Sequence, residues 1–190
     1  MADSPVSISL EFTPNPNTLK FVVNRSFLEK GAANFLSAAS AADSPLATRL
    51  FGVSGVQAVM VGTNFVTITK SLQGSWDALA DDIPKALQAH FQAGEAAFTA
   101  QWLREQENKR SQTPDTEVEK KIRDILDSEI RPAVAMDGGD IVFERFENGT
   151  VYLHLQGACS SCPSSIMTLK MGVETRLKEA IPEIVEVVQV

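Results

Sequence analysis

The pair Asn148-Gly149 constrains the fold of this chain more than any other feature of its sequence. It separates two runs, residues 141–147 and 150–156, that are rich in β-branched and aromatic residues. Asn-Gly between such runs is the strongest short-range signal for a two-residue β-hairpin, because both turn residues must adopt positive φ. The expected core face of this hairpin has five members: Phe146 opposite Val151, Val142 opposite Leu155, and Leu153.

The elements around the hairpin complete a small mixed domain. Thr116-Glu117-Val118-Glu119 is a capping-box pattern and predicts a helix that ends near Arg131-Pro132. A second helix is expected from Pro163, followed by a strand over residues 184–190. The order is therefore helix, strand, strand, helix, strand. The apolar stripe of the second helix has helical spacing and consists of Ile166, Leu169, Val173, Leu177 and Ile181.

The first hundred residues also mix strands and helices. Ser44-Pro45 starts a short helix, because Ser is a favourable N-cap and Pro suits the first helical position. Residues 101–114 are polar and mark a boundary. We predict an α+β fold in two small domains, residues 1–100 and 115–190, joined by a linker over 101–114. The predicted strands of the first domain are 6–12, 19–23, 56–61 and 65–69, and its predicted helices are 27–42, 45–51 and 76–98.

Charge and hydropathy exclude some classes of partner. The chain has 190 residues and a net charge of −7, whereas nucleic-acid binding relies on clustered Lys and Arg. Its apolar runs are well short of the ~20 residues that span a bilayer. The first five residues, Met1 to Pro5, have neither the basic start and apolar run of a signal peptide nor the Arg-rich character of a transit peptide. We therefore expect a cytoplasmic, bacterial-type protein with no nucleic-acid or membrane partner.

Cys159 and Cys162 are the only cysteines and form a Cys-Ser-Ser-Cys-Pro motif. The motif lies between a predicted strand and the helix that opens at Pro163, and amide N–H groups at a helix start favour the thiolate. Gly157 lets the backbone approach a ligand closely. A closed zinc site or an iron–sulfur cluster needs about four ligands, and these two thiolates supply half of them. The remaining ligands must come from histidine, from a small thiol or from another chain.

The residues alone leave several interpretations of the motif open. Two chains could share a 4Fe–4S cluster or a zinc ion through four thiolates, or one chain could cycle between dithiol and disulfide as a thiol–disulfide oxidoreductase. A thioredoxin fold has most of its sheet after the motif, whereas one helix and one strand follow it here. In the remaining interpretation, the two cysteines are a buried structural pair. Neither histidine is expected to complete the site, because His154 falls on the outer hairpin face beside Phe143 and His90 is expected to be solvated.

Two further features are weighed against the site. Met136-Asp137-Gly138-Gly139-Asp140 resembles a phosphate loop but lacks the Lys and Ser or Thr that such a loop needs, so a tight turn into the hairpin is expected. Met167 and Met171 are four residues apart and are expected to pack or to form part of a dimer surface.

The sequence also resembles one known family. Residues 132–141, 155–165, Thr168-Leu169-Lys170 and Pro182-Glu183 are similar to the C-terminal domain of NifU-like (Nfu-type) proteins, and residues 13–21 resemble the Nfu N-terminal domain. The cysteine-rich middle domain of the longer NifU proteins is missing.

This resemblance implies a function for the chain. It implies an iron–sulfur scaffold and carrier, not an enzyme, that holds a labile 4Fe–4S cluster in a homodimer through Cys159 and Cys162. Upstream assembly proteins would supply the cluster, and apo client proteins would receive it. The N-terminal domain contains a predicted turn near residue 15, within the segment that resembles the family. We hypothesise that this domain recognises clients or modulates cluster release. A packing of residues 136–140 beside the cysteine loop is also implied.

Overall fold

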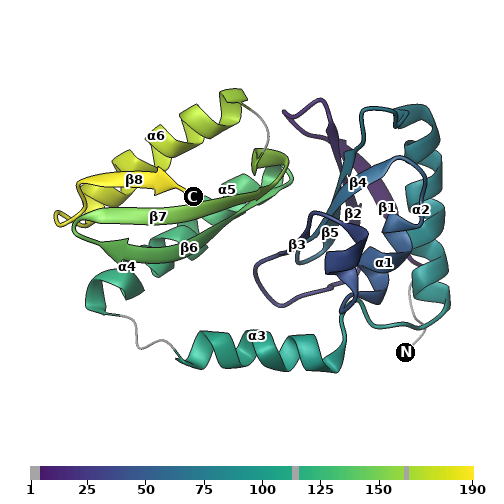
Figure 1. Cartoon of the computed structure of the whole chain (residues 1–190), viewed down its shortest axis with the longest axis horizontal. Helices are drawn as coiled ribbons and strands as arrows, with labels where there is room; N and C mark the ends of the chain where they lie inside the picture. The colour runs from purple at the N-terminus through teal and green to yellow at the C-terminus, as the bar shows by residue number, and fades with distance from the viewer. Residues whose placement is uncertain (1–4, 113–115, 161–162) are drawn as a thin grey trace.

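The computed structural model describes residues 5–112, 116–160 and 163–190, and for residues 109–112 and 163–169 it describes the backbone alone. Two separate hydrophobic cores lie on either side of helix α3 (Ala100–Gln112). Figure 1 shows the two parts side by side, with α3 connecting them along one edge. The predicted α+β class is confirmed. None of the described helices is long and apolar enough to cross a membrane.

The N-terminal part is an antiparallel sheet with helices on one face. Its strand order is β1-β2-β5-β4-β3. The helices α1 and α2 pack on the face that carries Phe21, Val59 and Ile68, which are fully buried. The elements are β1 (Ile8–Phe12), β2 (Thr18–Val23), β3 (Ala33–Phe35), a 3₁₀ turn (Ala38–Ala41), α1 (Pro45–Phe51), β4 (Val56–Val61), β5 (Phe65–Lys70) and α2 (Trp76–Gln92).

The opposite face of this sheet has no helix on it in Figure 1. We call it the helix-free face, and its members point away from the core: Thr18, Lys20, Met60, Phe65 and Thr67. All five are nonetheless buried, and the C-terminal part of the chain contacts three of them, Lys20, Met60 and Thr67.

Two predictions for the N-terminal part are wrong. Residues 27–42 are not a helix, because Gly31 adopts φ 78° and Ala33–Phe35 pairs with β4 as an edge strand. The helix from Trp76 ends at Gln92 instead of near Phe98, because Gly94 adopts φ 67° just after the cap and turns the chain. The short helix after Ser44 is confirmed, and the Ser44 side chain accepts a hydrogen bond from the amide of Ala47.

The C-terminal part has the predicted order of elements. Its three-stranded sheet has the order β6-β7-β8, in which β6 and β7 are antiparallel and β7 and β8 are parallel. The helices before and after the hairpin bury apolar residues against this sheet, among them Ile122 of the first and Val173 and Leu177 of the second. The elements are α4 (Glu117–Ile125), a π-helical turn (Leu126–Ile130), α5 (Arg131–Met136), β6 (Gly139–Glu147), β7 (Thr150–Gly157), a 3₁₀ turn (Ala158–Ser160), α6 (Pro163–Ala180) and β8 (Glu186–Gln189).

The hairpin register is confirmed at the turn and is wrong beyond it. Phe146 pairs with Val151, as the Asn-Gly turn requires, and Asn148 adopts φ 51°. A bulge between Phe143 and Arg145 then shifts the register by one residue. Val142 therefore pairs with His154, not with Leu155. As a result, the strand buries Ile141 and Phe143, whereas Val142 is half-buried.

The helix at residue 117 begins as predicted and continues beyond its predicted end. Thr116 and Glu119 form the reciprocal capping box. The chain remains helical past Pro132, because the π-helical turn places Pro132 in the first turn of α5, where an amide N–H is not needed. This extension carries α5 to Met136, and only Asp137 and Gly138 separate it from the start of β6 at Gly139.

Candidate functional site

Cys159 lies at the junction between the last residue of β7 and the start of α6. It belongs to the 3₁₀ turn Ala158–Ser160, which the Ser160 hydroxyl closes by donating to the Gly157 carbonyl at 2.8 Å. The predicted strand-to-helix position is thus observed for this cysteine. Cys162 lies outside the residues that the structure describes. The assignment of both thiols as ligands therefore stays a prediction.

The Cys159 sulfur packs directly over Gly139. Only 4% of the Cys159 surface is exposed, and the residue belongs to the C-terminal core. A Cβ added at Gly139 would lie 2.5 Å from the Cys159 Sγ, which is closer than such atoms approach in proteins. Gly139 pairs with Gly157 across the hairpin, so the start of β6 and the end of β7 form one platform under the thiol. The absence of a side chain at Gly139 is therefore a condition for this sulfur position.

The turn at residues 136–140 packs beside the cysteine loop. Gly138 adopts φ 76° and Gly157 adopts φ 62°, a region of backbone space that glycine enters readily. The Ala158 amide donates to the Gly138 carbonyl at 3.1 Å, and a Cβ on Gly157 would lie 2.6 Å from that carbonyl oxygen. The turn expected from the sequence is thus present, and its backbone contacts the cysteine loop.

A buried ion pair that the sequence analysis missed anchors this turn. The Asp140 carboxylate is 3% exposed and lies 2.8 Å from the Arg131 Nε. Arg131 also donates to the Ile141 carbonyl at 2.8 Å. Burial raises the pKa of Asp140, and the neighbouring Arg131 opposes that shift without cancelling it. A carboxylate directly before the apolar run Ile141–Phe143 is the signal that would have indicated such a pair.

Both histidines have other surroundings in the part of the chain that the structure describes. His154 is half-exposed on the outer face, where its Nε2 lies 2.6 Å from a Glu144 carboxylate oxygen and its Nδ1 contacts the Val190 carbonyl. The expectation that His90 is solvated is wrong: it is 1% exposed in α2 and burial lowers its pKa. Among the described residues, no three His, Cys, Asp or Glu side chains gather as a metal site would require.

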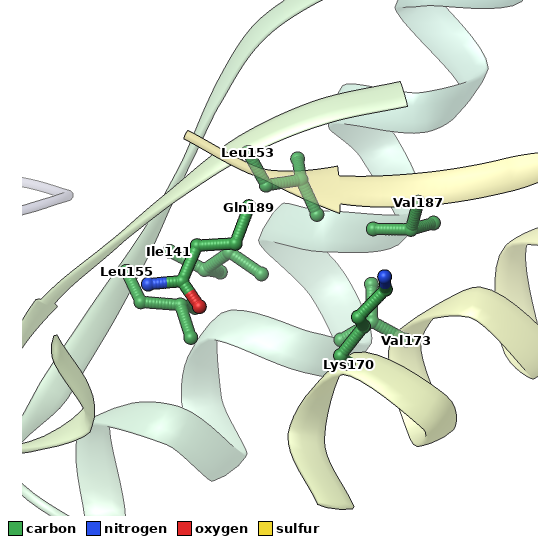
Figure 2. Close-up of a pocket in the computed structure, with 7 residues that line it drawn as sticks. All are labelled: Ile141, Leu153, Leu155, Lys170, Val173, Val187 and Gln189. Carbon is green, nitrogen blue, oxygen red and sulfur yellow. The ribbon is translucent and has the colours of Figure 1, made fainter. Parts of the chain in front are cut away.

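The described residues of the C-terminal core enclose a small cavity. Figure 2 shows a small apolar cavity between α6, which contributes Val173, and the sheet residues Ile141, Leu153 and Val187. Its volume is about 10 Å³, which is about the space of one water molecule. This cavity is too small for a metal cluster.

Two regions of the chain match known protein families. Residues 122–188 match the NifU-like domain, and residues 8–94 match the domain described as scaffold protein Nfu/NifU N terminal. The human protein named NFU1 iron-sulfur cluster scaffold homolog, mitochondrial, is 41% identical over 184 residues, which cover 96% of this chain and 71% of the human protein. The chain belongs to the Nfu family of NifU-like proteins. The resemblance expected from residues 13–21 and from the residues around the cysteines is thereby confirmed.

Two further relatives extend the comparison. NifU-like protein 4, mitochondrial, from Arabidopsis thaliana is 39% identical over 179 residues, and the chain spans 63% of that protein's length. The solution structure of a NifU-like protein from Saccharomyces cerevisiae is 25% identical over 53% of this chain and 92% of its own, with a TM-score of 0.46.

The predicted cytoplasmic location is wrong. The human and Arabidopsis relatives are both named as mitochondrial proteins. The prediction rested on the first residues of the chain. The match with this chain covers only part of each relative's length, 71% of the human protein and 63% of the Arabidopsis protein. The character of those residues therefore carries no information about the compartment.

Proposed function

We propose that this protein is an iron–sulfur cluster scaffold and carrier, in which Cys159 and Cys162 of two copies hold one labile 4Fe–4S cluster. The observation that carries the proposal is the position of Cys159, on a glycine platform between β7 and α6 of a NifU-like domain. The names of its relatives as iron–sulfur cluster scaffolds support the same role. We propose a mitochondrial location on the basis of those names.

The number of ligands supports a shared cluster. A 4Fe–4S cluster takes four protein ligands, whereas the sequence contains two cysteines. The described residues bring no further group of metal ligands together. A second copy of the chain supplies the missing pair with the same geometry and two-fold symmetry.

A half-site in each chain also suits delivery. Thiolates of an apo client replace these thiolates one at a time, so the cluster passes on by ligand exchange. The protein forms and breaks only metal–sulfur bonds, and we propose a carrier rather than an enzyme. Its partners are an upstream cluster donor, a second copy of itself and apo iron–sulfur proteins.

Anaerobic reconstitution with iron and sulfide tests this function. We expect about four irons and four sulfides per dimer, with a broad absorption band that appears as the chain changes from monomer to dimer in size-exclusion chromatography. Cys159→Ser and Cys162→Ser should each abolish the band, whereas Leu72→Ala, at an exposed position of the N-terminal part, should retain it. Stoichiometric zinc without sulfide, or metal-free turnover of disulfides, would instead support the zinc-bridged module or the thiol–disulfide oxidoreductase.

A further inference from the structure

The helix-free face of the N-terminal sheet is buried although no helix covers it. Met60 and Thr67 are register partners on β4 and β5, and Lys20 pairs with Thr67 from β2. These three residues therefore form one continuous patch across adjacent strands. Each of them is at most 8% exposed. A sheet face that carries Lys and Thr would normally lie in water, so its burial marks a specific contact.

The C-terminal segments that cover this patch are those that frame Cys159. The Thr67 hydroxyl donates to the Gly138 carbonyl at 2.8 Å, and the Asn15 amide donates to the Ala158 carbonyl at 3.0 Å. The Lys20 ammonium donates to the Met136 carbonyl at 3.3 Å. Three side-chain donors of the N-terminal part thus satisfy three backbone carbonyls of the cysteine site.

The contact is close enough to depend on glycine. A Cβ on Gly138 would lie 3.0 Å from the Thr13 methyl carbon, and a Cβ on Gly157 would lie 2.7 Å from the Met60 sulfur. Both glycines therefore admit the N-terminal sheet as well as their own backbone turns. Together with the hydrogen bonds, this fit distinguishes the contact from a chance approach of two domains.

This arrangement covers the backbone directly before Cys159. The Cys159 sulfur is 4% exposed because it packs on Gly139 within the C-terminal core, and the N-terminal part adds contacts to the two preceding residues, Gly157 and Ala158. The neighbouring Ala158 carbonyl, at the open end of the turn, is already bound to Asn15. A second cysteine loop that approached Gly157 and Ala158 would meet the N-terminal part at Met60 and Asn15.

We propose that the helix-free face is an internal docking surface that holds the cysteine loop closed in the cluster-free chain and must separate from it before two copies share a cluster. The proposal rests on the proposed function, because only a shared cluster requires the loop to be reachable. Helix α3 keeps the two parts tethered after separation, so the docking is reversible and competes with the second copy at a high effective concentration.

The test is a full-length variant that cannot close. Met60→Glu with Thr67→Asp places two carboxylates on paired positions of the helix-free face, one facing Gly157 and the other opposing the Gly138 carbonyl that Thr67 now binds. Neither side chain belongs to the N-terminal core, so the sheet should stay folded. Gln57→Glu with Asn64→Asp is the matched control, because it adds the same charge to the same hairpin at exposed positions. Thr67→Val is an isosteric second variant that removes a single hydrogen bond.

Three measurements on the metal-free full-length chains read out the effect. Small-angle X-ray scattering gives the radius of gyration, and alkylation of Cys159 by iodoacetamide in a Cys162→Ser background gives thiol access without any cluster. Anaerobic reconstitution of the chains with both cysteines gives the rate of cluster loading. We expect the charged variant to be expanded and to alkylate and load at least about tenfold faster, since losing contacts worth one or two hydrogen bonds changes an equilibrium by that order. Thr67→Val should show a smaller gain and the control none.

The outcomes separate this proposal from the proposed function. A wild-type chain that is already as expanded as the charged variant overturns the proposal, and so does an expanded variant with unchanged rates. A variant that stays as compact as the wild type also counts against it, because the contacts named above then do not hold the parts together. Faster alkylation in chains that never bind iron and sulfide would support the docking surface and refute the proposed function. If the charged variant and the wild type are alkylated at the same rate and load a cluster at the same rate, the result would support the proposed function and refute the docking surface.

Discussion

Gly139→Ala is the substitution that most directly tests the geometry of the cysteine site. The added methyl group would lie 2.5 Å from the Cys159 Sγ, 3.0 Å from the Cys159 Cβ and 3.0 Å from the Gln156 carbonyl oxygen. All three neighbours belong to the C-terminal part, and the carbonyl is backbone that cannot rotate away. The backbone of Gly139 is not in the positive-φ region, so the cost arises from crowding alone. Overpacking of this kind costs about 1–3 kcal/mol.

The thiol moves to relieve this crowding, so the substitution has two effects. The stability of the C-terminal part should fall by about 1–3 kcal/mol, which lowers its melting temperature by about 4 °C or more in a domain of this size. The Cys159 side chain should also become more reactive, because it is displaced from the core position that it now occupies. Both effects are properties of the metal-free chain and do not depend on the proposed cluster.

Chemical denaturation distinguishes the two parts of the chain. Trp76 and Trp102 are the two tryptophans and both pack against the N-terminal core, so tryptophan fluorescence follows that part while circular dichroism follows the whole. We expect Gly139→Ala to shift only the dichroism transition. Gly172→Ala is the matched control, because no described atom beyond the helix's own backbone lies within 4 Å of a Cβ there, and Ala favours a helix such as α6 by about 0.5–1 kcal/mol. If Gly139→Ala is as stable as the wild type and its Cys159 is alkylated at the same rate, the argument for a glycine platform is wrong.

Three other predictions concern the groups around the site and the two parts of the chain. Burial lowers the pKa of His90, so below pH 6.5 the unfolded chain binds a proton that the folded chain does not bind. The stability of the N-terminal part should therefore be full above pH 6.5 and should fall by about 1.4 kcal/mol per pH unit as the pH drops towards the lowered pKa. In unfolding followed by fluorescence, His90→Phe should lose this pH dependence. Arg131→Met leaves the Asp140 carboxylate buried without its cation and should destabilise the C-terminal part by about 3–5 kcal/mol, whereas Arg131→Met with Asp140→Asn should recover much of that loss in the same denaturation assay. Deletion of residues 1–100 should leave cluster binding intact while slowing transfer to an apo client, measured by client activation; unchanged transfer rates would refute a role of the N-terminal domain in delivery. The same deletion, with limited proteolysis, tests the division into residues 1–100, 101–114 and 115–190, which remains a proposal.

Local signals predicted much of the fold. The Asn148-Gly149 turn set the first pairs of the hairpin, and the caps at Ser44 and Thr116 marked two helix starts, because each of these features acts within a few residues. The bulge at residues 143–145 was not predictable in this way. It changes which residues face the core, and no turn signal in the sequence marks it.

Features that depend on tertiary contact were missed for the same reason. The edge strand β3 has three residues and forms only because β4 lies beside it. His90 looks like an exposed residue late in an amphipathic helix until the neighbouring elements bury it. Thr67 alternates with apolar neighbours, as any outward-facing strand residue does. Its hydrogen bond to Gly138, which lies 71 residues later in the chain, forms only when the two parts dock.

The chemistry of the docking contact favours reversible closure over a permanent interface. Its hydrogen bonds run from Asn15, Lys20 and Thr67 to backbone carbonyls, and water can satisfy all these groups when the parts separate. An apolar contact of the same area would leave an exposed adhesive surface on both parts. The glycines divide the two tasks of the loop: Gly139 faces the Cys159 sulfur, whereas Gly157 faces Met60 of the sheet. Sulfur position and docking can therefore be perturbed separately, and a substitution on the sheet should change access to the thiol without changing the platform on which it rests.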